Sequence, residues 1–157
     1  MKLIGTIASI NVNRNGGVPK HRVAGSRITF NGVAGDKQRY KNHGGPDRAI
    51  TLLASCKILQ MREAGHMITP GSTGENITIR GMDDADWDSL VEGDRLQINN
   101  AILKLTFRAP PCSTIAESFI NKDFKQMDPD VNPHFARWCA SVEKEGDIMN
   151  DDEIYKL

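Results

Sequence analysis

The chain has 157 residues, of which 39% are hydrophobic, and this length suits one domain that builds its own core. Its 20 Lys and Arg residues balance 20 Asp and Glu residues, which excludes a strongly basic nucleic-acid-binding protein. The balance hides an asymmetry, because residues 1–62 carry 11 basic and two acidic residues, and residues 63–157 carry nine basic and 18 acidic ones. The positive half can therefore still build a local site for an anionic ligand.

The first residues, MKLIGTIASINV, lack the long apolar run and the small-residue cleavage site of a secretory signal. No apolar stretch approaches the roughly 20 residues that cross a bilayer. The three cysteines, Cys56, Cys112 and Cys139, are widely spaced and form neither a CxxC pair nor a zinc-finger pattern. We therefore expect a cytoplasmic protein with reduced thiols, no membrane segment and no structural zinc.

Short β-rich runs separated by glycine and proline dominate the chain. The expected strands are residues 3–12, 27–31, 49–54, 76–80, 95–98, 101–107, 138–143 and 153–156. Asn99 and Asn100 join two of them, which is typical of a tight hairpin because Asn tolerates positive φ. No repeat or linker divides the chain. We therefore expect a single, mainly β domain over residues 1–157, a barrel or sandwich with a few short accessory helices.

Two helical segments are expected among these strands. Ser55 can cap a helix that runs to about Ala64 and ends at Gly65. The residues of this helix available to the core are Ile58, Leu59 and Met61. A second short helix is expected to start near Ser113. Its apolar residues are Ile115, Ala116, Phe119 and Ile120.

The segment GDKQRYKNHGGPDR, residues 35–48, is the densest in polar chemistry. Lys37, His43 and Arg48 can supply charge-assisted hydrogen bonds, and Gly44-Gly45 lets backbone N–H groups approach a ligand. No Gly-Lys-Ser/Thr follows at the spacing of a Walker A motif. Two interpretations stay open: an anion-binding loop, or a solvated basic loop closed by a Gly-Gly-Pro turn.

The segment PGSTGENITI, residues 70–79, forms a glycine-shaped turn that leads into a strand. Glu75 and Asn76 then lie at the mouth of the strand, where a carboxylate and an amide can read a polar heterocycle. The simpler interpretation, favoured on these residues alone, is a loop-to-strand junction in which Asn76 bonds nearby backbone.

Cys112 follows two prolines that end the strand at residues 101–107, and a short helix is expected at once. Free N–H groups and the positive end of a helix dipole favour a thiolate, the form that attacks sulfur and binds metal. Cys56 and Cys139 lie in an apolar helix and an apolar strand, where buried, inert thiols are expected. We therefore select Cys112 as the candidate reactive cysteine, against the alternative of an unreactive loop residue.

The run DDADWD at residues 83–88 imitates the opening of a calcium loop. Its sixth position is Ser89 rather than Gly and its twelfth is Arg95 rather than Glu, so we expect a solvated acidic loop, with a docking surface for a basic protein as the alternative. His21, His66 and His134 lack partners at metal-ligand spacing and are expected to be surface or hydrogen-bonded residues. Arg137 precedes an apolar run and is expected either in a pocket or on the rim of the barrel.

Together these segments resemble the stand-alone MOSC domains, a family named after the C-terminal domain of molybdenum cofactor sulfurases. The matching segments run in order along nearly the whole chain. They are GVPK (17–20), GD (35–36), HGGPDRA (43–49), PGSTGENIT (70–78), GDRL (93–96), Pro111-Cys112 and the final part entered through Arg137. HGGPDRA, PGSTGEN and a following Pro-Cys form a specific combination at this separation.

The resemblance implies a MOSC-type β-barrel and a pocket for the molybdenum cofactor, a pterin dithiolene that carries a phosphate. In related amidoxime-reducing proteins the matching cysteine ligates the metal, so Cys112 would coordinate molybdenum or carry sulfur. Lys20, Arg48 and Arg137 would hold the phosphate or the pterin, and Asn76 would contact the pterin. The other cofactor-binding candidates in these motifs are Lys37, His43, Gly44, Gly45 and Glu75.

Three functions stay open under this resemblance. The first is a reductase of small N-hydroxylated compounds that removes oxygen at a Cys112-ligated metal, with an electron-donor protein as partner. The second is a sulfurtransferase in which Cys112 carries a persulfide from a cysteine desulfurase to a cofactor or metallocluster. The third is a carrier module that binds the cofactor without turnover.

Two departures from the family pattern bear on these functions. Pro111 and Ser113 flank the cysteine where the family often has Arg or Lys, and the nearest upstream cation is Arg108. The chain also lacks the pyridoxal-phosphate desulfurase domain of the full-length sulfurases. Pyridoxal phosphate is therefore not expected here, and sulfur would come from a separate protein. Exposed strand edges permit a dimer without requiring one.

Overall fold

The computed structural model describes residues 1–37 and 43–157 of the chain. Its strands are β1 (Lys2–Val12), β2 (His21–Val23), β3 (Gly25–Thr29), β4 (Gly32–Val33), β5 (Ile50–Ala54), β6 (Ile77–Arg80), β7 (Arg95–Ile98), β8 (Ala101–Arg108), β9 (Trp138–Lys144), β10 (Gly146–Met149) and β11 (Glu153–Lys156). Its α-helices are α1 (Ser55–Glu63) and α2 (Asp84–Asp88). Its short 3-10 helices are η2 (Pro46–Arg48), η3 (Ser113–Ser118), η4 (Ile120–Lys122), η5 (Phe124–Met127) and η6 (Pro133–Phe135).

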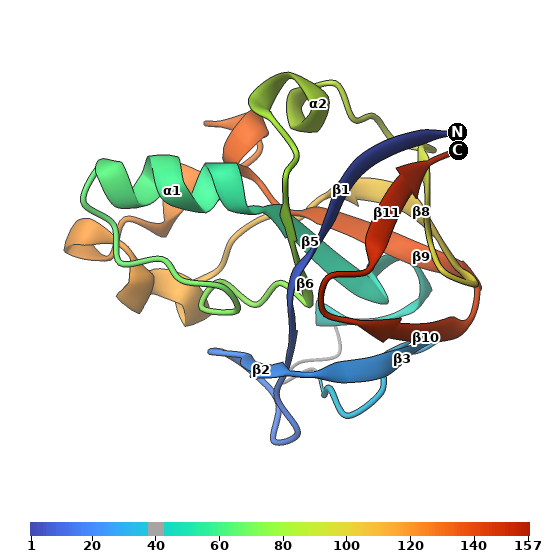
Figure 1. The fold of residues 1–157 in the computed structure, drawn as a ribbon. Coiled ribbons are helices and arrows are strands. Elements are labelled where there is room, and N and C mark those ends of the chain that lie inside the picture. Colours follow the sequence, from blue (N-terminus) through green and yellow to red (C-terminus); the bar gives the residue numbers. More distant parts are fainter. Residues whose placement is uncertain (38–42) are drawn as a thin grey trace.

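Seven strands close into a β-barrel in the order β11-β7-β8-β9-β5-β6-β1, and β1 pairs with β11 to complete the circle. Neighbouring strands are antiparallel except for the parallel pair β5 and β6. Lys2 of β1 is in register with Lys156 of β11, so the two chain ends lie side by side (Figure 1). The expected mainly β fold and its barrel form are confirmed.

The core of the barrel is built from β-branched and aliphatic residues of the central strands. Every residue of β5 is buried, because β5 is covered by the barrel interior on one side and by other segments on the other. Leu52 pairs with Ile77 in the parallel ladder, and both side chains are almost completely buried. Each such side chain stabilises the folded state by about 1.5–3 kcal/mol relative to exposure to water.

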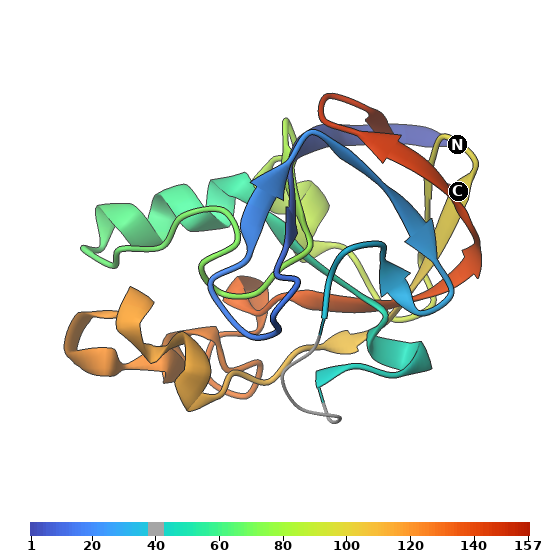
Figure 2. The same cartoon turned by 90° about the horizontal axis from the view of Figure 1, so that it is seen from below.

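A smaller sheet, in the order β10-β3-β4, lies beside the barrel (Figure 2). Ile28 of β3 and Ile148 of β10 are buried and tie this sheet to the common core. The sequence predicts none of the short strands β2, β4 and β10, and it places the end of β3 two residues too late. These strands have two to four residues, so they show too little alternation to be recognised.

Helix α1 occupies the expected segment, but two details differ from the prediction. Ala54, not Ser55, is the N-cap residue, and no side chain caps the helix. Leu59 is 61% exposed rather than directed to the core, whereas Ile58 and Met61 are buried as expected. The position that sequence reasoning missed is Lys57, which is buried within the helix.

The acidic run at residues 83–88 forms helix α2 rather than the expected loop. Asp83 caps it by accepting a hydrogen bond from the backbone N–H of Asp86. Asp84 and Asp88 each lie 3.1 Å from the Nζ atom of Lys57, whose side chain is only 4% exposed. The acidic residues therefore neutralise a buried cation of α1, which explains why they are ordered into a helix.

The second expected helix begins at Ser113, as predicted, and consists of short 3-10 turns, η3 to η5. Ile115, Ala116 and Phe119 are buried as expected, whereas Ile120 is 45% exposed. Asn99 has a φ of 53° and forms the expected tight turn, since Ile98 and Ala101 pair directly across it.

Candidate functional site

A pocket opens at one rim of the barrel and holds about 520 Å³ of empty space, part of it open to solvent. The loop after β1, the segment before β5, the loop before β6 and the segment between β8 and β9 all contribute to it. The side chains that give it its chemistry are Lys20, His43, Arg48, Cys112, Thr114 and Arg137. Five of these six are residues that the sequence predicts, and they come from segments far apart in the chain.

Cys112 lies where β8 has ended and η3 begins, in an extended conformation with a φ of −136°. Its Sγ atom is 2.8 Å from Oγ1 of Thr114 and 3.9 Å from Nε2 of His43. The cysteine is half-buried, so its thiol is accessible from the pocket. The expected support from a helix dipole is weak, because η3 is a six-residue 3-10 helix. The groups that can polarise Cys112 are therefore neighbouring side chains.

His43 supplies the nearest imidazole to the thiol. Burial lowers the pKa of His43 below its usual 6.5, and the nearby cations Arg48, Arg137 and Lys20 lower it further. The imidazole is therefore favoured in its neutral form, which can accept a proton from a neighbouring donor.

Two arginines give the pocket its positive charge. Arg137 is almost completely buried, and its Nη1 and Nη2 groups donate to the carbonyl oxygens of Thr73 and Pro110. Arg48 follows the Gly-Gly turn, and its guanidinium lies 5.7 Å from the centre of the Phe107 ring. The Nε–H groups of both arginines are buried and have no hydrogen-bond partner among the described residues. Such donors are rare in folded proteins and suit a site that a ligand completes.

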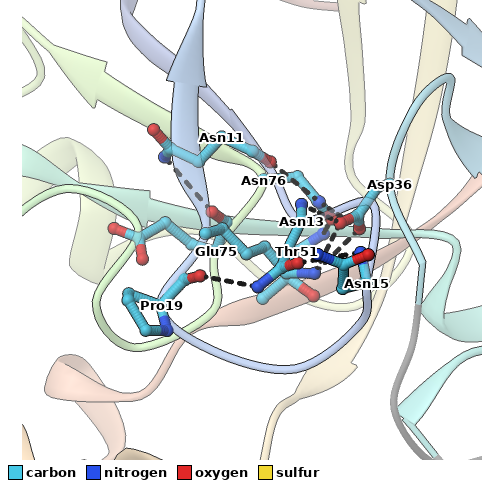
Figure 3. A network of polar contacts seen from close by, with 9 residues as sticks. Asn11, Asn13, Asn15, Pro19, Asp36, Thr51, Glu75 and Asn76 are labelled. Carbon is cyan, nitrogen blue, oxygen red and sulfur yellow. Dashed lines mark hydrogen bonds and ion pairs between the residues drawn. The ribbon is translucent and has the colours of Figure 1, made fainter.

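Lys20 lines the pocket and donates to the carboxylate of Asp36. Asp36 lies at the centre of a network of polar contacts (Figure 3). The carboxylate of Asp36 accepts hydrogen bonds from Lys20 Nζ, from the backbone N–H of Asn13 and from the side-chain amide of Asn76, all at 2.8–2.9 Å. The side-chain oxygen of Asn76 accepts from the backbone N–H of Thr51 at 3.0 Å. This network fixes the loop after β1 against β5 and β6.

The glycines of the PGSTGEN loop allow it to pack closely against the pocket. Gly71 has a φ of +86° and contacts the backbone of Lys20, whose N–H donates to the Gly71 carbonyl at 2.9 Å. A Cβ atom at Gly74, where φ is +87°, would lie 3.0 Å from Val18 and 3.7 Å from the Arg137 guanidinium. Larger residues at these positions would be strained and would crowd the pocket wall.

Glu75 does not face the pocket. Its side chain is completely buried, and it accepts hydrogen bonds from the hydroxyl groups of Thr73 and Thr78 at 3.2 Å. Burial raises the pKa of Glu75, while the Arg137 guanidinium acts in the opposite direction. Glu75 is therefore an internal carboxyl group held by Thr73 and Thr78, and Asn76 is likewise an internal bridge.

Other expected site residues lie outside the pocket lining. Lys37 is exposed, and Gly44 and Gly45 belong to the loop behind His43. Gly45 has a φ of +98° and precedes η2, so it is a turn residue that directs Arg48 into the pocket. The central part of the basic segment, residues 38–42, lies outside the described residues.

The remaining candidates take structural roles. Burial raises the pKa of the Cys56 thiol to about 11, and Cys139 is completely buried with a raised pKa. Arg108 faces away from Cys112, because its guanidinium lies 4.4 Å from the ring centre of Trp138 and 5.2 Å from that of Trp87. Burial lowers the pKa of Arg108 to about 10.

Sequence reasoning missed Asp36 and Thr114 as site residues. Asp36 belongs to the Gly35-Asp36 motif, and an acid next to several basic residues in the segment at residues 35–48 is a signal for an ion pair. Thr114 carries no such signal, since its hydroxyl reaches Cys112 only because η3 turns back at once.

Within residues 1–37 and 43–157, no three His, Cys, Asp or Glu side chains gather in a way that would hold a metal ion. None of the helices in the same residues has the length and apolar character needed to span a membrane.

The residues of the pocket fit the molybdenum cofactor that the resemblance implies. That cofactor presents a phosphate and a metal already held by sulfur, so the protein needs to supply cations and one soft ligand. Arg48 and Arg137 offer unpartnered N–H donors, and Cys112 offers an accessible thiol beside them. This donor set suits an anionic, sulfur-bearing ligand better than a free divalent cation.

Comparisons with known proteins agree with the fold and the motifs. Similar solved structures include YuaD from Bacillus subtilis, with 19% identity and a TM-score of 0.71, where the match covers 96% of this chain and 93% of that one. YiiM from Geobacillus stearothermophilus matches at 22% identity with a TM-score of 0.70, over 97% of this chain and 74% of that one. YiiM from Escherichia coli matches at 21% identity with a TM-score of 0.68, over 100% of this chain and 70% of that one. At these identities the structures establish the fold alone.

No curated protein matches the sequence. The model of the MOSC domain family, by contrast, matches residues 39–155, well over half of the chain. The chain therefore belongs to the MOSC domain family.

Proposed function

We propose that this protein binds a molybdenum cofactor in the pocket around Cys112 and reduces small N-hydroxylated compounds there. One observation carries the proposal. Arg48 and Arg137 meet Cys112 at a single pocket, and each arginine has a buried Nε–H without a partner among the described residues. A phosphorylated ligand would satisfy both donors, and a thiolate beside them suits a sulfur-rich metal centre.

The roles of the chain follow from its contacts. Arg48 and Arg137 bind the anionic part of the cofactor, because their free Nε–H groups can donate to phosphate oxygens. Lys20 keeps its charge matched by Asp36 and fixes the floor of the pocket. Cys112 supplies the protein ligand to the metal.

The proton of the Cys112 thiol has an acceptor nearby. His43 Nε2 lies 3.9 Å from Sγ, and its neutral form can take the proton when the thiolate forms. Oγ1 of Thr114 lies 2.8 Å from the same sulfur, and its hydroxyl can donate to the thiolate.

When bound, the cofactor supplies two-electron oxygen-atom transfer at its metal. The overall reaction converts a hydroxylamine, R–NHOH, with two electrons and two protons into the amine R–NH₂ and water. The electrons come from a separate donor protein, because the chain shows no flavin, haem or iron–sulfur motif.

Sulfur transfer is the second candidate, and the contacts of Cys112 favour it over a carrier without turnover. The Cys112 thiolate can attack the outer sulfur of a persulfide on a donor protein. The new S–S bond forms on Cys112 as the donor's S–S bond breaks, and the donor cysteine leaves as a thiolate. His43 accepts the thiol proton in this reaction also.

Cofactor content tests the proposal. The protein is expressed in a host that makes the molybdenum cofactor, and molybdenum and pterin are measured in the wild type and in Cys112→Ala. Reduction of an N-hydroxylated compound is measured on the same samples with a chemical electron donor. Bound cofactor with activity in the wild type, and loss of activity in Cys112→Ala, is the expected result.

Cys56→Ala is the matched control, because Cys56 lies on α1 outside the pocket and should leave both measurements unchanged. A sulfur adduct on Cys112 after incubation with a cysteine desulfurase, without bound metal, would refute the reductase function and support the sulfurtransferase function. Equal metal in both proteins without activity would leave only a carrier. Absence of both pterin and persulfide would refute all three functions.

A further inference from the structure

A second hollow adjoins the Cys112 pocket and differs from it in chemistry. This groove holds about 790 Å³ of empty space, part of it open to solvent. Its apolar walls come from Val18, Pro19, Met67 and Ile115. Val18, Thr114 and Ile115 line both hollows, so the groove and the Cys112 pocket lie next to each other and share a wall.

The contact that joins the two hollows is the Thr114–Cys112 pair. Oγ1 of Thr114 lies 2.8 Å from Cys112 Sγ, and Thr114 also lines the groove. A molecule seated in the groove can therefore contact Thr114, the residue whose hydroxyl lies next to the sulfur.

The two hollows differ in the charge of their lining side chains. The Cys112 pocket contains Lys20, Arg48 and Arg137, whereas the described lining of the groove contains no cation and one carboxylate, Glu117. Lys122 lies 3.3 Å from Glu117, but both side chains are at least 70% exposed, so this pair is worth little. An anion is thus favoured in the pocket and disfavoured in the groove.

Met67 marks the groove as an adaptable apolar surface. The residue is 78% exposed, and its backbone N–H donates to the Ser118 carbonyl at 2.9 Å, which fixes the backbone of one wall to the other. A flexible thioether on a fixed backbone can pack against flat ligands of different shape.

From these observations we infer that the groove is the substrate subsite and that it selects flat, apolar N-hydroxylated compounds that are neutral or cationic. This inference rests on the proposed function and adds the substrate class to it. The apolar body packs against Met67, Val18 and Pro19, and the N-hydroxyl end lies toward Thr114 and the Cys112 pocket. Phosphorylated or carboxylated compounds are rejected by Glu117 and by the absence of a cation to pair with them in the described lining.

Three probes test the charge preference. They are N-phenylhydroxylamine and its analogues with a 4-carboxylate or a 4-trimethylammonium group. For the cofactor-loaded protein, the KM of the carboxylate is expected to be at least about 10-fold above that of the neutral compound, and that of the cation no higher than the neutral value. Glu117→Lys should reduce or reverse the difference in KM between the carboxylate and the neutral compound. Glu117→Gln should bring the KM of the cation to that of the neutral compound.

A binding measurement separates this inference from the proposed function. The amine products of the same probes are added to protein with ¹³C-labelled methionine methyl groups, and Met67 is assigned with Met67→Leu. The Met67 methyl resonance is expected to shift with the neutral and cationic amines but not with 4-aminobenzoate. Met149 is the internal control, because it is 61% exposed on β10 and does not line the groove.

Each outcome has one consequence. Cofactor and activity with equal KM values for the three probes, or without a Met67 shift, would overturn the groove as the subsite and leave the proposed function intact. A selective Met67 shift in a protein that binds no cofactor would support the groove and refute the reductase. Met67→Asp should raise the KM of the neutral probe by about 10-fold, whereas Leu59→Asp, on the exposed face of α1, should not.

Discussion

Lys20 and Asp36 form an ion pair with Nζ–O distances of 2.8 and 2.9 Å, and their side chains are only 3% and 5% exposed. The positive charge of Lys20 is thus matched inside the protein. Among the described residues of the pocket, Arg48 and Arg137 are consequently the arginines that carry an unpartnered Nε–H and form no ion pair with a carboxylate.

Removal of one partner of this buried pair should destabilise the fold. Asp36→Asn leaves the Lys20 ammonium buried without a countercharge, so the free energy of unfolding should fall by about 3–5 kcal/mol. Urea denaturation measures the loss. Asp147→Asn is the control, because Asp147 pairs with Arg27 at the surface and its loss should cost about 0–1 kcal/mol. Equal losses in the two variants would contradict a special role for the buried pair.

The two arginines should control cofactor retention. Arg48→Gln removes a charged donor from the pocket, and one such hydrogen bond contributes about 1.5–3 kcal/mol. Pterin retained after gel filtration should correspond to about 10- to 100-fold weaker binding. Lys104→Gln, which removes an exposed cation from β8, should retain the wild-type amount. Equal retention in Arg48→Gln and the wild type would place the anion elsewhere.

The pocket shows which parts of a site a sequence can reveal. HGGPDRA and the Pro-Cys step are contiguous motifs, and they supply His43, Arg48 and Cys112, all of which line the pocket. The resemblance implies that Asn76 contacts the pterin, but its amide bridges Asp36 and Thr51 inside the protein. The local sequence shows that a polar residue lies at the start of a strand. It does not show whether its amide bonds to the protein interior or faces the pocket.

The fold shows the same difference between features encoded locally and features that depend on distant contacts. Strands with clear alternation or long apolar runs, such as β1 and β8, appear in the sequence nearly to the residue. The two-residue strand β4 exists only because β3 lies beside it, and nothing local encodes that contact. Helix α2 depends on the buried Lys57 of α1, so its acidic residues resemble a solvated loop until α1 is placed.

Arg108 should be a stability residue rather than an activator of Cys112. Its guanidinium stacks on Trp138 and Trp87, and its Nη1 donates to the Ala136 carbonyl at 2.9 Å. Arg108→Ala should therefore lower the free energy of unfolding by about 2–4 kcal/mol and leave the cofactor content of the folded protein unchanged.

Urea denaturation and molybdenum analysis of the folded fraction measure these two quantities. Arg95→Ala is the control for stability, because Arg95 makes only an exposed pair with Glu143 in the described residues and should cost about 0–1 kcal/mol. Loss of cofactor without loss of stability in Arg108→Ala would show that Arg108 belongs to the cofactor site instead.

The titration of His43 should reveal the positive field of the pocket. Burial, Arg48, Arg137 and Lys20 lower the pKa of His43, so the unfolded chain binds more protons near and below pH 6.5 than the folded one. The free energy of unfolding should therefore decrease as the pH falls through this window. Arg48→Ala should raise the pKa of His43 and weaken the dependence. NMR of the imidazole C–H groups measures the pKa, and a pKa at or above 6.5 in the wild type would contradict the geometry.

Alkylation should distinguish Cys112 from the other two cysteines. The pKa of Cys56 is about 11, so only about one molecule in a thousand carries that thiolate at pH 8, and Cys139 is completely buried. Cys112 opens into the pocket beside His43 and Thr114, and iodoacetamide should modify it about 100-fold faster than either. Mass spectrometry of the native protein should show one adduct, and Cys112→Ala should show none over the same time.

The cofactor-loaded protein should be protected, because a metal-bound sulfur is no longer available to the reagent. Equal labelling of loaded and cofactor-free protein would contradict Cys112 as the metal ligand.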